Sequence, residues 1–122
     1  MTILYIALGG ALGALARHYL AAVVIHHAGR GLPWGTLTVN ITGCFIIGLA
    51  GALAGKYGMS PHMRSFVFVG LISAFTTFST YGLESYNLMR SGAMLAAMAN
   101  ILLSNLAGIA AVFIGVLISR HV

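Results

Sequence analysis

Hydrophobic residues fill four long stretches of the chain, and polar residues collect in the intervals between them. The stretches cover about residues 3–25, 36–53, 66–88 and 94–118. Each is close to the roughly 20 residues that an α-helix needs to cross a bilayer core about 30 Å thick. None alternates with the two-residue period of a barrel strand, and a helix satisfies its own backbone hydrogen bonds in lipid. The pattern predicts an all-α membrane protein with one four-helix transmembrane domain over residues 1–122.

The intervals contain the residues that end helices. Pro33 and Gly35 break the chain between the first two stretches, and Trp34 suits the level of the lipid headgroups. The segment "KYGMSPHMR" (residues 56–64) separates the second stretch from the third, and "MRSGA" (residues 89–93) separates the third from the fourth. The loops are short, so we expect a multi-pass protein with no soluble domain.

The composition excludes several classes of function. Of 122 residues, 60% are hydrophobic and 6% are charged, against about a quarter charged in soluble domains. The net charge of +5 is scattered along the chain, so we expect no nucleic-acid partner. Glu84 is the single acidic residue, and no nucleophile motif or phosphate loop is present, so enzyme chemistry is unsupported. The five histidines are too dispersed to predict a metal site.

Positive charges give almost no preferred orientation in the membrane. With four spans, one side has Lys56, Arg64 and Arg120, and the other has Arg30 and Arg90. Such a small difference is a weak positive-inside signal. Either the chain inserts both ways and pairs with an inverted copy of itself, or other cues set a single orientation. Because four short helices enclose little interior, we expect an oligomer.

Four of the polar side chains inside the hydrophobic stretches are candidates for a functional site or for joining helices. Arg17 would either extend to the headgroups or line a wet vestibule. Glu84 is a functional-site candidate because an acid at membrane depth is costly, although a hydroxyl or water near the interface would also satisfy it. Asn40 and Asn105 have amides that bridge helices more often than they line ion paths.

The third stretch contains an unusual concentration of hydroxyl groups, in "SAFTTFSTYG" (residues 73–82). Its hydroxyl-bearing residues are Ser73, Thr76, Thr77, Ser79 and Thr80. One or two such hydroxyls would bond back to their own helix. Five within eight residues favour a broken helix, whose freed backbone groups can bind ions where the break is buried in protein or lines a water-filled cavity.

Two aromatic residues of the same segment share a helical face. Phe78 and Tyr81 are three residues apart. Ring edges directed into a path would favour a small anion, and ring faces would favour a cation. The spacing does not choose between these possibilities or simple packing.

Small residues predict close approach between helices. Gly9 and Gly13 form one GxxxG pair, and Gly51 and Gly55 form a second. The sequence leaves open whether these faces meet within one subunit or between two.

Three segments together resemble one known family. They are "GGALGALARHYL" (residues 9–20), "PWGTLTVNITGCFIIG" (residues 33–48) and "TTFST" (residues 76–80). The chain is similar in these segments, and in its four-span layout, to the Fluc fluoride channels, also called CrcB proteins. The resemblance implies an antiparallel, dual-topology homodimer in the cell (inner) membrane. Two pores would export fluoride passively from the cytoplasm and so confer fluoride resistance.

The resemblance also implies roles for particular residues. A structural Na⁺ at the dimer centre would be held by the backbone carbonyls of Ser73 and Thr76. The fluoride pathway would include the residues that match the family's pore positions and their neighbours: Arg17, Asn40, Thr77, Phe78, Ser79, Thr80, Tyr81, Glu84 and Asn105.

The sequence departs from the family pattern at three places. Tyr81 replaces the usual second phenylalanine, and its added hydroxyl would either donate to an anion or narrow the path. Ser73 and Ala74 stand where two glycines are common, a difference that would alter the helix break and its sodium site. Ile101 and Ile109 flank Asn105 where polar residues are frequent. These departures keep open a heterodimer with a paralogue.

Two other classes of protein compete with the channel interpretation. A coupled exporter of the small multidrug-resistance type is similarly short and antiparallel, but it needs an acid in the first span, where this chain has Arg17. A non-conducting assembly subunit would use the hydroxyls only to join helices. Neither accounts for "PWGTLTVN" together with "TTFST".

Overall fold

The computed structural model describes residues 1–29 and 31–122. Arg30, which contributes to the charge count above, lies outside the described residues. The described chain is helical almost throughout, with no strand in those two ranges. Its elements are α1 (Thr2–Ala28), α2 (Trp34–Tyr57), α3 (Pro61–Arg64), the π-helix η1 (Ser65–Ile72), α4 (Ser73–Phe75), α5 (Phe78–Arg90) and α6 (Met94–Ser119).

Within the described residues, four helical segments are long and apolar enough to cross a membrane. They are Thr2–Ala28, Trp34–Tyr57, Pro61–Arg90 and Met94–Ser119. The prediction of an all-α chain with four membrane-length helices is confirmed. The third segment begins earlier than its apolar stretch, because Ser60 accepts a hydrogen bond from the backbone N–H of Met63 (3.3 Å) and Pro61 suits a first helical turn.

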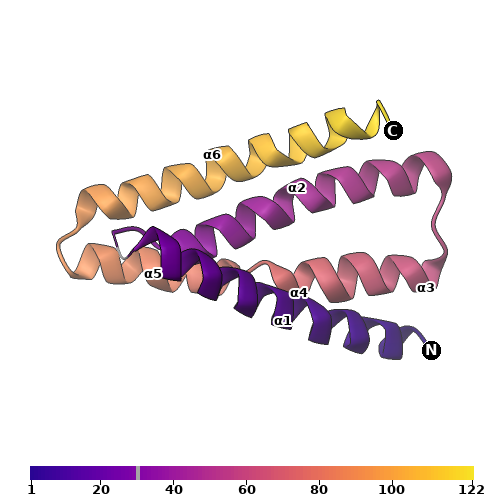
Figure 1. The fold of residues 1–122 in the computed structure, drawn as a ribbon, viewed down its shortest axis with the longest axis horizontal. Helices are drawn as coiled ribbons and strands as arrows, with labels where there is room; N and C mark the ends of the chain where they lie inside the picture. Colours follow the sequence, from indigo (N-terminus) through magenta and orange to yellow (C-terminus); the bar gives the residue numbers. More distant parts are fainter. Residues whose placement is uncertain (30) are drawn as a thin grey trace.

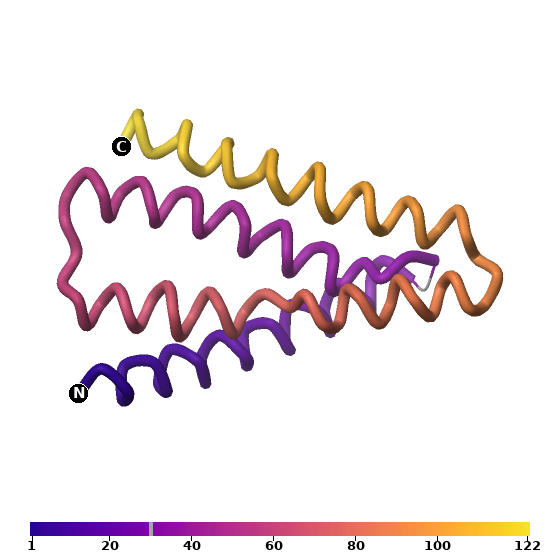
Figure 2. Tube along the Cα trace, turned by 180° about the vertical axis from the view of Figure 1, so that it is seen from behind, coloured from indigo at the N-terminus to yellow at the C-terminus, as the bar shows by residue number. Residues whose placement is uncertain are grey.

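The helices run lengthwise in two packed pairs. α2 lies beside α6, and α1 packs on η1 and α4 (Figure 1). Both termini and the turn between α2 and α3 lie at the same end of the bundle, as the view from behind also shows (Figure 2). Only a few side chains are fully enclosed, with Val39 and Asn100 the largest. Most large apolar side chains face outward, as lipid or a partner subunit requires.

Glycines let both helix pairs approach closely. A Cβ added at Gly9 would lie 2.3 Å from the Phe66 carbonyl oxygen, and one added at Gly70 on η1 would lie 2.7 Å from the Ile6 carbonyl oxygen of α1. The first GxxxG pair therefore meets the third span within one chain. Gly51 and Gly55, in contrast, have no atom within 4 Å of an added Cβ.

The third span contains two residues of extended backbone. Thr76 (φ −83°, ψ 158°) and Thr77 (φ −148°, ψ 111°) separate α4 from α5. Thr77 caps α5, since its hydroxyl oxygen accepts from the backbone N–H of Thr80 at 3.3 Å. These two residues, which we call the Thr76–Thr77 segment, lie where the sequence concentrates its hydroxyl groups.

Candidate functional site

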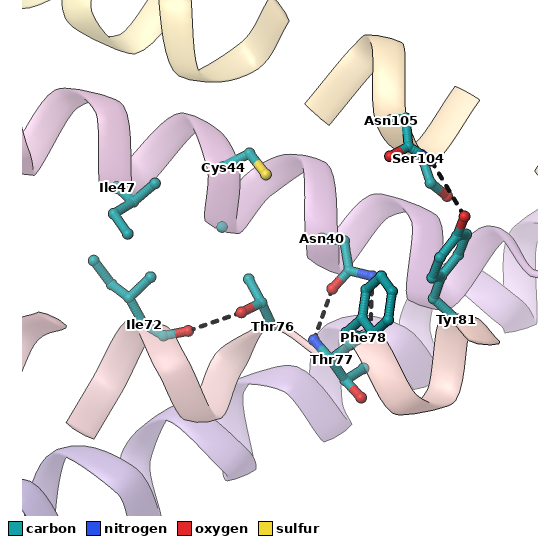
Figure 3. A pocket seen from close by; sticks show the side chains of 11 residues that line it. Asn40, Cys44, Ile47, Ile72, Thr76, Thr77, Phe78, Tyr81, Ser104 and Asn105 are labelled. Atoms are coloured by element: carbon teal, nitrogen blue, oxygen red, sulfur yellow. Dashed lines mark hydrogen bonds between the residues drawn. The ribbon is translucent and has the colours of Figure 1, made fainter. Parts of the chain in front are cut away.

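Asn40 on α2 binds the backbone of the Thr76–Thr77 segment. Its Oδ1 accepts from the Thr77 N–H at 2.8 Å, and its Nδ2 donates to the Thr77 carbonyl at 3.1 Å (Figure 3). One amide side chain thus satisfies both polar backbone groups of a residue that has left the helix. Asn40 bridges two helices, and it also lines the cavity described below.

Two carbonyls near the Thr76–Thr77 segment lose their helical donors. In a continuous helix, the Thr77 N–H would donate to the Ser73 carbonyl and the Thr80 N–H would donate to the Thr76 carbonyl. Here the first N–H donates to Asn40 and the second donates to the Thr77 hydroxyl. The carbonyls of Ser73 and Thr76 are therefore released from helical bonding. Carbonyl oxygens of this kind are suitable ligands for a hard cation such as Na⁺.

A cavity of about 280 Å³ opens between α2, α6 and the Thr76–Thr77 segment. Its wall is mostly apolar, with polar groups at a few points (Figure 3). It brings together six of the predicted site residues, namely Asn40, Thr76, Thr77, Phe78, Tyr81 and Asn105. The other lining residues are Gly43, Cys44, Ile47, Ile72 and Ser104.

The two aromatic rings lie side by side at this cavity. The ring centroids of Phe78 and Tyr81 are 5.4 Å apart, with the rings tilted by 51°. Phe78 is 82% exposed in the single chain, so its ring is available to a ligand, to lipid or to a second subunit. Simple packing within the chain does not account for so exposed a ring.

The Tyr81 hydroxyl and Asn105 form a hydrogen bond between α5 and α6. Asn105 Nδ2 donates to the Tyr81 hydroxyl oxygen at 3.2 Å (Figure 3). It also donates to the Ile101 carbonyl at 2.7 Å. Both amide hydrogens are therefore engaged, whereas the tyrosine hydroxyl accepts a bond and keeps its own proton to donate. Of this pair, Tyr81 offers the free donor.

A second cavity, of about 370 Å³, lies between α1, α2 and α5. Arg17 and Thr80 are among its lining residues, and so is Thr77, which borders the first cavity as well. Arg17 thus lies at a cavity of the single chain. The Thr77 hydroxyl donates to Thr80 Oγ1 at 3.0 Å and lies 3.4 Å from Ser79 Oγ, so the hydroxyls cluster at the start of α5.

Glu84 lies apart from the first two cavities. Its Oε1 accepts from the Thr36 hydroxyl at 2.8 Å, and its buried Oε2 has no hydrogen-bond partner among the described residues. The residue borders a third cavity of about 400 Å³, together with Gly29, Leu32 and Pro33. A hydroxyl satisfies one carboxylate oxygen, as one of the two interpretations anticipated. Ser73 and Ser79 border none of these three cavities.

The sequence did not single out Thr36 or Ser104. Thr36 is 48 residues from Glu84, so no spacing pattern could have joined them. Ser104 lines the first cavity, and its buried hydroxyl has no partner in the described part of the chain. Its position next to Asn105 in a mostly apolar helix was the available signal.

The fold and these cavities define a small multi-pass membrane protein with polar groups gathered between its helices. The family model described as "CrcB-like protein, Camphor Resistance (CrcB)" matches residues 4–116. The chain therefore belongs to the CrcB family, which confirms the resemblance seen in the sequence.

Three relatives illustrate the similarity, and each is named fluoride-specific ion channel FluC. The Salinibacter ruber protein is 47% identical over 115 residues, covering 94% of this chain and 86% of its own length. The Magnetococcus marinus protein is 46% identical over 121 residues and 98% of both chains. The Methylobacterium radiotolerans protein is 42% identical over 123 residues, covering 98% of this chain and 85% of its own. Their names describe ion channels and not enzymes, in agreement with the prediction of no enzyme chemistry.

Proposed function

We propose that this protein is a passive, fluoride-selective ion channel that exports fluoride from the cytoplasm. The observation that carries the proposal is the first cavity, where Asn40, Phe78 and Tyr81 meet beside the Thr76–Thr77 segment. The names of the relatives support the same ion and the same class of activity.

The chemistry of the site suits a small, strongly hydrated anion. A route for fluoride must replace its water with donors such as amide N–H groups, hydroxyl O–H groups and the positive edges of aromatic rings. The Tyr81 hydroxyl retains its proton, and the Phe78 ring is exposed. Hydrogen fluoride crosses bilayers and dissociates in the cytoplasm, so the trapped anion can leave down its own gradient through such a route.

We propose a route that begins in the second cavity and continues past Thr77 into the first. Arg17 would attract the anion into the second cavity. Thr77, which borders both cavities, would lie at the passage from the second to the first. Thr80 would offer a hydroxyl in the second cavity, and the rings of Phe78 and Tyr81 would follow in the first. Ser79 borders neither cavity in the single chain and would act beside the path, 3.4 Å from the Thr77 hydroxyl. Asn105 would act through the hydroxyl of Tyr81, and Glu84, held by Thr36, would lie beside the path.

We further propose that the working unit is an antiparallel, dual-topology homodimer with two pores. The nearly balanced positive charges support this arrangement, and so do the apolar outer faces of the single chain. The exposed ring of Phe78 would then be covered by the second copy. In this arrangement the Thr76–Thr77 segment lies at membrane depth and is shielded from lipid by protein, as a broken span requires. A heterodimer with a paralogue is the alternative form of the same channel.

The residues beside the Thr76–Thr77 segment fit a structural Na⁺. The carbonyls of Ser73 and Thr76 would hold the ion, because their helical donors are engaged elsewhere. Bound there, the ion would supply positive charge that balances the carbonyl dipoles of the two antiparallel copies. The hydroxyls of Ser73 and Thr76 donate to Phe68 and Ile72 carbonyls, which leaves their own backbone oxygens available.

Fluoride efflux from liposomes tests the proposed function. Purified protein is reconstituted with internal fluoride, and a fluoride-selective electrode follows its release after the counter-ion is made permeant. We expect rapid efflux with no proton gradient, and far slower efflux of chloride in a matched assay. Efflux no faster than from protein-free liposomes would refute the homodimeric channel. A strict requirement for a proton gradient would favour the coupled exporter, although Arg17 in place of an acid in the first span argues against it.

Replacing Phe78 by isoleucine should lower fluoride efflux about tenfold, because the ring edge is lost from the path. The side chain is 82% exposed in the single chain, so the fold itself should tolerate the change. Tyr86→Ile is the matched control, since Tyr86 is an exposed aromatic of α5 outside the first cavity. Equal efflux from the Phe78 variant and the unmodified protein would remove this ring from the route.

A further inference from the structure

Helices α5 and α6 are joined by two side-chain hydrogen bonds, one helical turn apart. The first joins Asn105 to the Tyr81 hydroxyl at the first cavity. The second joins Asn100 Nδ2 to Ser85 Oγ at 2.9 Å. Because α5 and α6 run antiparallel through a short turn (Figure 1), Tyr81 bonds to Asn105 while Ser85, four residues on, bonds to Asn100.

The second bond lies in the interior of the chain. Asn100 is 2% exposed and Ser85 is 5% exposed. Ser85 is the buried residue of α5, whereas the rest of that helix is partly or fully accessible. In the interior of the chain, α5 and α6 are therefore joined by a hydrogen bond between two buried polar side chains.

Ser85 also connects this bond to Tyr81. Its hydroxyl donates to the Tyr81 carbonyl at 2.8 Å while accepting from Asn100. Asn100 thus contacts, through one serine, the backbone of the residue whose ring and hydroxyl line the first cavity. Neither Asn100 nor Ser85 lines that cavity.

A buried amide is costly unless it is bonded, and an apolar side chain of similar size would fill the same space. What the polar pair adds is a fixed register of α5 against α6. A shift of α5 by one residue would move its side chains by about 1.5 Å along the axis and about 100° around it. Such a shift would turn the Tyr81 ring away from the cavity.

We propose that Asn100 and Ser85 are positioning residues that hold Tyr81 in the fluoride route. The inference rests on the proposed channel function. In this proposal, a buried pair outside the route fixes the register of α5 against α6. That register in turn fixes the position of Tyr81, which stands where the resemblance to the family leads us to expect phenylalanine.

The test combines fluoride efflux with a direct observation of Tyr81. We expect Asn100→Leu and the milder Ser85→Ala each to lower efflux about three- to tenfold, the effect of one lost buried hydrogen bond. Ser85→Asn combined with Asn100→Ser exchanges the partners and should restore efflux above that of Asn100→Leu. With 3-fluorotyrosine incorporated, the ¹⁹F resonance assigned to Tyr81 by Tyr81→Phe should shift or broaden in Asn100→Leu and Ser85→Ala.

Ser119→Ala is the control, since Ser119 is a buried serine of α6 whose hydroxyl bonds only within its own helix, to the Val116 carbonyl. It should change neither efflux nor the Tyr81 resonance. The proposal is overturned if Ser85→Ala conducts like the unmodified protein, if the exchanged pair gives no rescue, or if efflux falls while the Tyr81 resonance stays unchanged. Failure of the unmodified protein to conduct would instead refute the channel function.

Discussion

Replacing Asn40 by leucine should lower fluoride efflux about a hundredfold, because two hydrogen bonds to part-buried groups are lost together. The leucine can neither accept from the Thr77 N–H nor donate to the Thr77 carbonyl. Both backbone groups would be left without partners, and the Thr76–Thr77 segment would lose its attachment to α2. Initial efflux rates from liposomes measure the effect.

Asn40→Asp separates the two roles of this side chain. Aspartate keeps the shape of asparagine and an acceptor for the Thr77 N–H, but it loses the donor and brings a negative charge to the cavity. We expect this variant to unfold at a lower temperature in detergent, because its second carboxylate oxygen would face the Thr77 carbonyl oxygen, and to conduct fluoride poorly because like charges repel. If Asn40→Leu conducts at the unmodified rate, the route does not depend on Asn40.

Gly9→Ala should destabilise the fold by about 1–3 kcal/mol, the usual cost of overfilling a close-packed site. The added methyl group would lie 2.3 Å from the Phe66 carbonyl oxygen and 2.9 Å from the Leu71 nitrogen. Both atoms belong to the backbone of η1, so no side-chain rotation can relieve the clash. α1 would have to move away from the third span.

The neighbouring glycine provides the control. An added Cβ at Gly10 meets no atom within 4 Å, so Gly10→Ala should be neutral or more stable by up to about 1 kcal/mol, the difference in helix propensity. Unfolding of both variants in detergent, followed by circular dichroism, gives the comparison. Equal stability of the two variants would show that the contact between α1 and η1 is not tight.

The local elements of this protein were predictable because they depend on residues close together in the sequence. Hydrophobic stretches and the intervening prolines and glycines predicted the helices to within a few residues. The exception is the interval at residues 61–64, where Ser60 and Pro61 start a helix before the apolar stretch begins. The concentration of hydroxyls in residues 73–82 likewise marked the place where Thr76 and Thr77 leave the helix.

The pairing of polar groups was not predictable from local patterns. Asn40 was expected either to bridge helices or to line a path, and it bridges to a residue 37 positions away while lining the cavity. Asn105 had the same two possible roles, and it bonds to Tyr81 of α5 while lining the same cavity. Its amide hydrogens are both engaged, so the free donor beside it is the hydroxyl of Tyr81. Such partnerships depend on which helix faces lie together.

The sequence by itself determined that the protein lies in a membrane and that it has four spans, because bilayer thickness sets the length of a span. It also determined the family, because three motifs together specify CrcB. Only the tertiary structure decided how the polar groups are paired. Asn40 with Thr77, Thr36 with Glu84, and Asn100 with Ser85 each join separate helices. Hydrogen bonds act over about 3 Å, so residues distant in the sequence become partners only when helix packing brings their faces together.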